Sequence, residues 1–158
     1  MKVEHINPFL NAVSNTFATM LSADARRGDL SLGDPRVRTY PISGIIGLSG
    51  NASGTVVINM SNEVALAAAS TMLMEEMTEV NDDVLDAVGE IVNMIAGQAK
   101  TDLSEFELSM SLPNVVTGLG HEVRFPSATP PLCVPFETDH GPLRLEVGFE
   151  PSAAAAGV

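Results

Sequence analysis

Apolar side chains recur at intervals of three and four residues at the start of this 158-residue chain. In residues 3–21 they form one stripe over about five helical turns, made of Val3, Ile6, Phe9, Leu10, Val13, Phe17, Met20 and Leu21. This spacing predicts an amphipathic helix. Because proline suits a first helical turn, Pro8 places the start of the regular helix near Asn7. Residues 23–35 are polar and rich in Gly and Asp, which indicates a loop.

From residue 37 the pattern changes to short apolar runs broken by Pro41, Gly44 and Gly47, which are typical of strands. The sequence GNASG at 50–54 predicts a hairpin turn between two such runs. Residues 61–77 and 78–105 return to helical spacing. The candidate N-caps of these two helices are Ser61 or Asn62, and Asn81. Further β-type runs cover 106–113, 121–127, 132–139 and 142–150, and the last two flank the turn sequence DHG.

The order of elements is one helix, three strands, two helices and about four strands. It predicts an α+β fold, a mostly antiparallel sheet with three helices, of which two long ones pack on one face. We expect a single domain over residues 1–150 and a disordered tail over residues 151–158, which lack patterned apolar positions.

Composition and charge narrow the possible partners. The net charge of −12 and the pI near 4.4 disfavour nucleic acid and anionic membranes, because phosphate groups would be repelled. No apolar run approaches the roughly 18 residues of a membrane span, and the N-terminus lacks a signal-peptide pattern. We therefore expect a cytoplasmic protein. The single cysteine, Cys133, lies in an apolar run and is interpreted as a buried thiol in a reducing compartment.

The third predicted helix carries a polar stripe opposite its apolar face. At 100° per residue, one side of this helix collects Asp82, Asp86, Glu90, Asn93, Gly97 and Lys100. Glu90 and Asn93 are therefore neighbours that point away from the core. A solvated helix face explains such a pair equally well, because about 0.7 Glu-x-x-Asn pairs are expected by chance in this composition. A second pair, Glu4 and Asn7, occurs at the start of the first helix.

Two glycines and a methionine distinguish the Glu90–Asn93 pair from the Glu4–Asn7 pair. Glycine inside a helix costs about 1 kcal/mol relative to alanine. Gly97, on the stripe, would let another surface approach closely, whereas Gly89 has an alternative role in packing within the domain. Met94 lies beside the stripe, either as an adaptable contact for a partner or tucked into a helix–helix seam.

The sequence disfavours both a metal site on this helix and a Ser-His-Asp hydrolytic site. Asp82, Asp86 and Glu90 lie on one helix without a nearby His, so they would surround a metal ion poorly. The three histidines, His5, His121 and His140, fall in separate segments and predict no Ser-His-Asp triad.

The chain contains Asp86, Glu90, Asn93 and Pro113. In these residues it resembles the CheX-type phosphatases of bacterial chemotaxis, which are relatives of CheC and FliY. The family signature is an acidic residue or Ser, then Glu, then Asn three residues later, and finally a Pro. The resemblance covers about residues 3–150 and includes the sequence GEIVNMIAGQAK. CheC and FliY typically carry two such motifs and CheX one, so the one credible copy favours CheX. The fold that the resemblance implies is CheX-like and CheC-like.

The resemblance implies a phosphatase that hydrolyses the aspartyl phosphate of a CheY-like response regulator. Asn93 would position the attacking water, Glu90 would dock on the regulator's Lys, and Asp86 would support that contact. The other residues implied to bind substrate are Met94, Gly97 and Pro113. The chain would need no metal or cofactor of its own, because Mg²⁺ belongs to the receiver domain.

The resemblance also implies a homodimer formed through the sheet. Two alternatives to a phosphatase remain open at this stage. One is a non-catalytic adaptor of the same fold that binds a receiver, and the other is a structural subunit of a switch complex.

Overall fold

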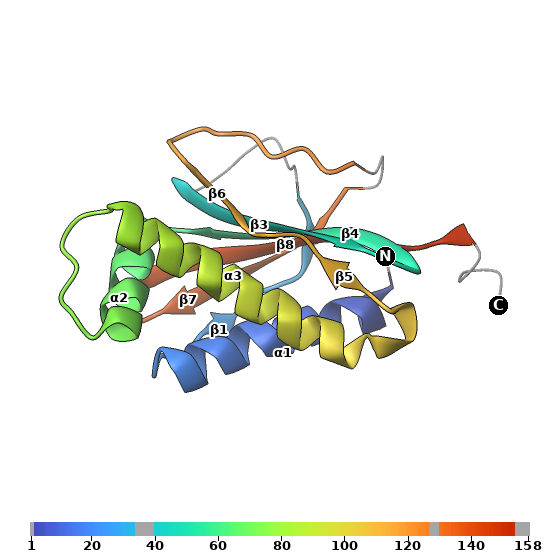
Figure 1. The fold of residues 1–158 in the computed structure, drawn as a ribbon, viewed down its shortest axis with the longest axis horizontal. Helices are drawn as coiled ribbons and strands as arrows, with labels where there is room; N and C mark the ends of the chain where they lie inside the picture. Colours follow the sequence, from blue (N-terminus) through green and yellow to red (C-terminus); the bar gives the residue numbers. More distant parts are fainter. Residues whose placement is uncertain (1, 34–39, 127–129, 154–158) are drawn as a thin grey trace.

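Three helices lie on one side of a curved antiparallel sheet (Figure 1). The structure is a computed structural model and describes residues 2–33, 40–126 and 130–153. The helices are α1 (Val3–Met20), α2 (Asn62–Leu73), α3 (Asp82–Asp102) and a 3₁₀ turn, η1 (Ser104–Phe106). The strands are β1 (Arg26–Arg27), β2 (Ser31–Leu32), β3 (Ile42–Ser49), β4 (Ala52–Met60), β5 (Ser109–Met110), β6 (Asn114–Thr117), β7 (Leu132–Thr138) and β8 (Gly141–Pro151). The α+β class predicted from the sequence is confirmed.

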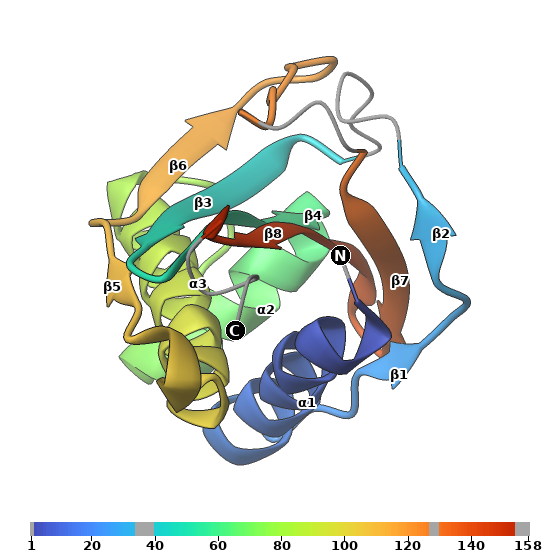
Figure 2. The ribbon, with the colours of Figure 1, turned by 90° about the vertical axis from the view of Figure 1, so that its right-hand side faces the viewer.

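The sheet is built around two hairpins. The hairpins β3–β4 and β7–β8 join side by side through β4 and β8, with Val56 opposite Val147 at the centre. The short strands β5 and β6 both extend along the outer edge of β3, and β1 and β2 extend along β7. Figure 2 shows that the strands form an arc and that the helices fill its concave side.

The helix starts follow local capping chemistry. The Ser61 hydroxyl accepts from the Val64 N–H at 3.2 Å, and the Asn81 carboxamide accepts from the Val84 N–H at 3.0 Å. Both predicted caps are confirmed.

Helix α1 begins earlier than the sequence predicted. It starts at Val3 rather than near Asn7, and Pro8 lies inside it. The carbonyl of Glu4 loses its helical donor at Pro8, but Glu4 is exposed, so water can bond this group. None of the helices in the described ranges is long and apolar enough to cross a membrane.

Several predicted β boundaries were wrong. The predicted loop contains β1 and β2, whose side chains are exposed and whose backbones pair with β7. No strand forms over 121–126, where Phe125 instead packs on Gly148, and β6 occupies 114–117. Strand β8 continues to Pro151, the first residue of the predicted tail, and the Ser152 N–H donates to the Asn51 carbonyl. Residues 154–158 of that tail lie outside the described residues.

Helix α3 packs closely against the backbone of β3 at Gly44. A β-carbon added to Gly44 would lie 3.0 Å from Cγ1 of Val92 and 3.5 Å from Cγ1 of Val88. Both valines are fully buried in the core. Because glycine has no side chain, α3 can approach β3 more closely here than any other residue would permit.

We predict that Gly44→Ala lowers the free energy of unfolding by about 1–3 kcal/mol, because the new methyl group overpacks the α3–β3 contact. Urea denaturation followed by circular dichroism measures the change.

Gly47→Ala is the matched control on the same strand. Its added β-carbon would meet Ser111 Oγ at 3.6 Å, an ordinary contact distance. Equal destabilisation by the two substitutions would contradict a tight contact specific to Gly44.

Candidate active site

The polar stripe predicted on α3 is present on the helix surface opposite the core. Asp86 and Glu90 are exposed, and Asn93 and Gly97 are half-buried. The buried face of the helix consists of Val84, Ala87, Val88, Gly89, Ile91, Val92, Ile95, Ala96 and Ala99. Acidic residues occupy the first turn of α3 and Lys100 the last, the polarity that the helix dipole favours. Glu90 and Asn93 thus project from a helix rather than from a loop.

The side chains of Glu90 and Asn93 are free to bind a partner. Within the described ranges, no hydrogen bond or ion pair engages the Glu90 carboxylate or the Asn93 carboxamide. The carboxamide can therefore use its oxygen as an acceptor and its NH₂ as a donor toward an external group. The other Glu-x-x-Asn pair differs, because Glu4 lies 3.8 Å from both the Lys2 ammonium and His5 Nε2.

The two glycines of α3 have different surroundings. A β-carbon at Gly97 would meet no atom of the described residues within 4 Å. At Gly89 it would meet Pro113 Cγ and Val115 Cγ2, both at 3.6 Å. Gly89 therefore lies against the segment that carries Pro113 and Val115, but 3.6 Å is an ordinary contact distance, so packing within the described residues requires glycine at neither position.

Pro113 and Met94, the remaining predicted contacts, border the same helix. Pro113 is half-buried against Gly89, one residue before Glu90, so the structure brings Pro113 to the stripe. Met94 is also half-buried and packs in part against the hydrophobic core, which leaves only part of its side chain for a partner.

The sequence pattern missed an open groove at the end of the stripe. The groove lies between the C-terminal half of α3 and the segment that enters β5, and it is lined by Gly97, Lys100, Thr101, Ser104, Glu107, Leu108 and Met110. Gly97, which has nothing packed on it, thus opens into a concave surface. No local signal marks this groove, because α3 and β5 form it jointly.

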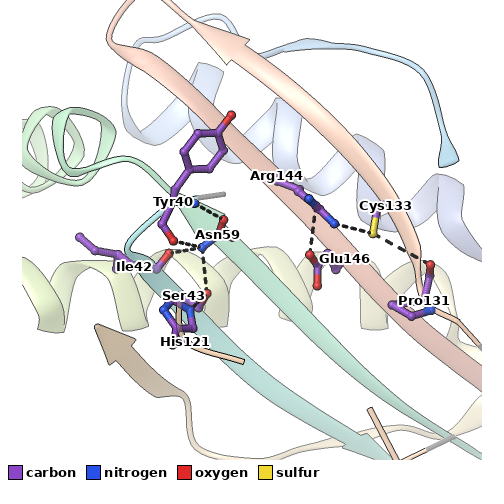
Figure 3. A network of polar contacts seen from close by, with 9 residues as sticks. All are labelled: Tyr40, Ile42, Ser43, Asn59, His121, Pro131, Cys133, Arg144 and Glu146. Carbon is purple, nitrogen blue, oxygen red and sulfur yellow. Dashed lines mark hydrogen bonds and ion pairs between the residues drawn. The ribbon is translucent and has the colours of Figure 1, made fainter. Parts of the chain in front are cut away.

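A second polar cluster lies on the sheet face away from the helices (Figure 3). Ser43 Oγ is 2.7 Å from His121 Nε2, and His121 Nδ1 is 2.7 Å from the Gly118 carbonyl. In the neutral imidazole, Nδ1–H donates to Gly118, and Nε2 accepts from the Ser43 hydroxyl. Ser43 is fully buried, so a substrate cannot reach its hydroxyl. This Ser–His pair, which the sequence did not predict, fastens the segment after β6 onto the sheet.

Asn59 completes that cluster. Its NH₂ group donates to the carbonyls of Tyr40 and Ile42 and to Ser43 Oγ, and its oxygen accepts from the Tyr40 N–H. Asn59 is fully buried, and these bonds use its polar atoms within the fold. The role of this cluster is therefore structural.

Cys133 is buried, as predicted, but it has a charged neighbour. The Arg144 guanidinium donates to Cys133 Sγ at 3.4 Å, and its Nε lies 3.0 Å from the buried Glu146 carboxylate (Figure 3). Burial alone would lower the pKa of Arg144, but the bond to Cys133 and the charge of Glu146 raise it. Among the described residues, no three His, Cys, Asp or Glu side chains cluster so as to hold a metal ion.

Comparison with known proteins relates this geometry to a family. The family model of the chemotaxis phosphatase CheX matches residues 42–137, which is more than half of the chain. The chain belongs to the CheX family. The matched range contains α3, its polar stripe and Pro113.

Three relatives illustrate how far the CheX similarity extends. The CheY-P phosphatase CheX of Thermotoga maritima is 26% identical over 121 residues, 75% of this chain and 78% of that protein. The chemotaxis protein CheX of Vibrio vulnificus has 33% identity and a TM-score of 0.86, covering 94% of this chain and 100% of that one. The CheX–CheY–BeF₃–Mg²⁺ complex from Borrelia burgdorferi matches with 26% identity and a TM-score of 0.77, covering 94% and 99%.

We predict that Gly97→Ala raises the free energy of unfolding of this CheX-family chain by about 0.5–1 kcal/mol. Alanine favours the helix over glycine, and no neighbouring atom opposes the added methyl group. Urea denaturation measures the difference. A loss of stability would show that Gly97 has a packing role in the isolated chain.

Proposed function

We propose that this chain is an aspartyl-phosphate phosphatase whose substrate is a phosphorylated CheY-like receiver domain. Membership of the CheX family supports the class of reaction, and the names of two relatives point to CheY as the partner. The observation that carries the assignment to a site is the unpartnered Glu90–Asn93 pair on the exposed face of α3.

Asn93 supplies the catalytic group in this proposal. A carboxamide is not a base near neutral pH, but it can orient a water molecule through one donated and one accepted hydrogen bond. The water oxygen attacks phosphorus in line with the bond to the aspartyl oxygen. That P–O bond breaks, the receiver's aspartate leaves as a carboxylate, and the proton of the water passes to the released phosphate and solvent. Positioning of this kind supplies much of the rate enhancement in phosphoryl transfer.

Glu90 sets the position of the receiver. Its exposed carboxylate pairs with the receiver's Lys beside the phosphoryl group, and Asp86, one turn earlier, adds negative charge next to that contact. The catalyst itself is acidic, with a net charge of −12, and the proposal assigns the cations near the phosphate to the receiver. The Mg²⁺ ion of the reaction accordingly belongs to the receiver domain, and this chain contributes no metal or cofactor.

We predict that Asn93→Ala lowers the turnover number about 100-fold or more with little change in KM, because the water is no longer oriented. Glu90→Gln raises KM for the phosphorylated receiver about tenfold, because a charge-assisted hydrogen bond is weakened. The measurement is phosphate release from an acetyl-phosphate-phosphorylated receiver as the receiver concentration is varied.

Asn7→Ala is the matched control for these variants, because Asn7 belongs to the other Glu-x-x-Asn pair and is exposed on α1. It should leave both constants unchanged. Wild-type activity in Asn93→Ala would refute the proposed chemistry. A wild-type protein that binds the receiver without accelerating phosphate release would instead be a receiver-binding adaptor.

We also propose that the chain forms a homodimer through its sheet. Strand β6 pairs only with β3 among the described strands, so its outer edge retains backbone groups for a second strand.

Size-exclusion chromatography with light scattering should therefore give about twice the chain mass of 16.6 kDa. A single monomeric peak across micromolar concentrations would contradict the dimer.

A further inference from the structure

The segment of residues 110–114, here called the ridge, runs beside the polar stripe of α3. Met110 lines the same groove as Gly97, and Pro113 lies against Gly89. The ridge therefore follows α3 in the opposite direction, from the level of Gly97 to that of Gly89. Eight residues of α-helix span about 12 Å, and Glu90 and Asn93 lie within that span. Figure 1 shows the segment from β5 to β6 alongside α3.

The ridge is held in place from both sides. The Ser111 N–H donates to the Gly47 carbonyl at 2.9 Å, and the Ser111 hydroxyl accepts from the Gly47 N–H at 2.9 Å. Met110 packs in part against the core, and Pro113 packs against Gly89. Leu112 lies between these anchored residues, yet 87% of its surface is exposed.

A single exposed leucine is common and has no meaning by itself. Leu112 is distinguished by its fixed backbone and by its place on the ridge, which runs alongside the helix that carries Glu90 and Asn93. A typical interface buries roughly 800 Å² on each partner, a patch about 30 Å across. A receiver whose phosphoryl group reaches Asn93 would therefore extend onto segments beside α3, and the ridge is one of them.

We propose that Leu112 is the apolar anchor that docks the receiver domain on this chain. This inference rests on the proposed function. The stripe residues that face the receiver, Asp86, Glu90 and Asn93, are all polar. They fix orientation and carry the chemistry, whereas affinity in protein interfaces comes mainly from a few buried apolar or aromatic side chains. Leu112 supplies such a side chain. It would enter an apolar hollow on the receiver, beside the cationic group that pairs with Glu90.

The test compares Leu112→Ala with Leu119→Ala. Leu119 is also 87% exposed, but it lies beyond the other end of β6, so about 13 Å of strand separates the two positions. Both substitutions remove the same apolar surface, and neither disturbs buried contacts. Each variant is assayed for phosphate release at varied receiver concentration. The affinity for the unphosphorylated receiver activated with beryllofluoride and Mg²⁺ is measured by titration calorimetry.

Leu112→Ala should raise both KM and the dissociation constant about tenfold while the turnover number stays unchanged. Leu119→Ala should alter none of the three. Leu112→Met, which keeps an apolar side chain of similar size, should restore most of the affinity. These results would separate the anchor from the catalytic Asn93, whose loss lowers turnover.

The inference is overturned if Leu112→Ala retains wild-type KM and affinity, or if Leu119→Ala weakens binding equally. A wild-type protein that accelerates phosphate release while Leu112→Ala has no effect would sustain the proposed function and refute the anchor. A wild type that binds without hydrolysis, and loses affinity in Leu112→Ala, would sustain the anchor and refute the phosphatase. A wild type that neither binds nor hydrolyses would refute both.

Discussion

The close contact between Val92 of α3 and Gly44 of β3 determines the orientation of the candidate site. Val88 and Val92 both pack on the backbone of β3, where a β-carbon on residue 44 would lie only 3.0 Å from Val92 Cγ1 and at an ordinary 3.5 Å from Val88 Cγ1. Glu90 is two residues from each valine, a rotation of about 200° around the helix. It therefore points almost directly away from the sheet. Asn93 follows Val92 by about 100°, which accounts for its partial burial. The proposed roles match these directions. Glu90, proposed to dock on the receiver, protrudes from the helix, and Asn93, proposed to position the water, is more buried.

The two glycines of α3, Gly89 and Gly97, lie in different surroundings. At Gly89 a β-carbon would lie at an ordinary contact distance from Pro113 and Val115, so this buried position faces the interior of the domain. At Gly97 a β-carbon would meet no atom of the described residues within 4 Å, so this position faces outward. An alanine there would strengthen the helix, and the proposed approach of a receiver would account for the glycine. The free carboxamide of Asn93 fits the same explanation, because its hydrogen-bonding capacity is left for an external group.

The helices could be predicted from the sequence because their signals are local. Asn81 caps α3 through its own side chain, and the apolar spacing of α3 placed Glu90 and Asn93 on its outer face. The strands were predicted less well, because β1, β2 and β6 are defined by backbone pairing with distant segments. Ser43 and His121 are 78 residues apart, so no sequence spacing could reveal their contact. Leu112 was hidden for the same reason: it precedes Pro113 within a run that reads as an ordinary strand.

The pair of hydrogen bonds between Ser111 and Gly47 has a mechanical consequence. Strand β3 carries Gly44, on which α3 rests, and three residues later Gly47, to which the ridge is tied. Helix α3 and the ridge, which together form the proposed docking surface, are thus both fixed to β3, a strand in the interior of the sheet. They cannot slide relative to each other without breaking buried contacts or backbone hydrogen bonds. A partner would meet a surface already in its final shape, so association would require little ordering of this chain and no loop closure before the reaction.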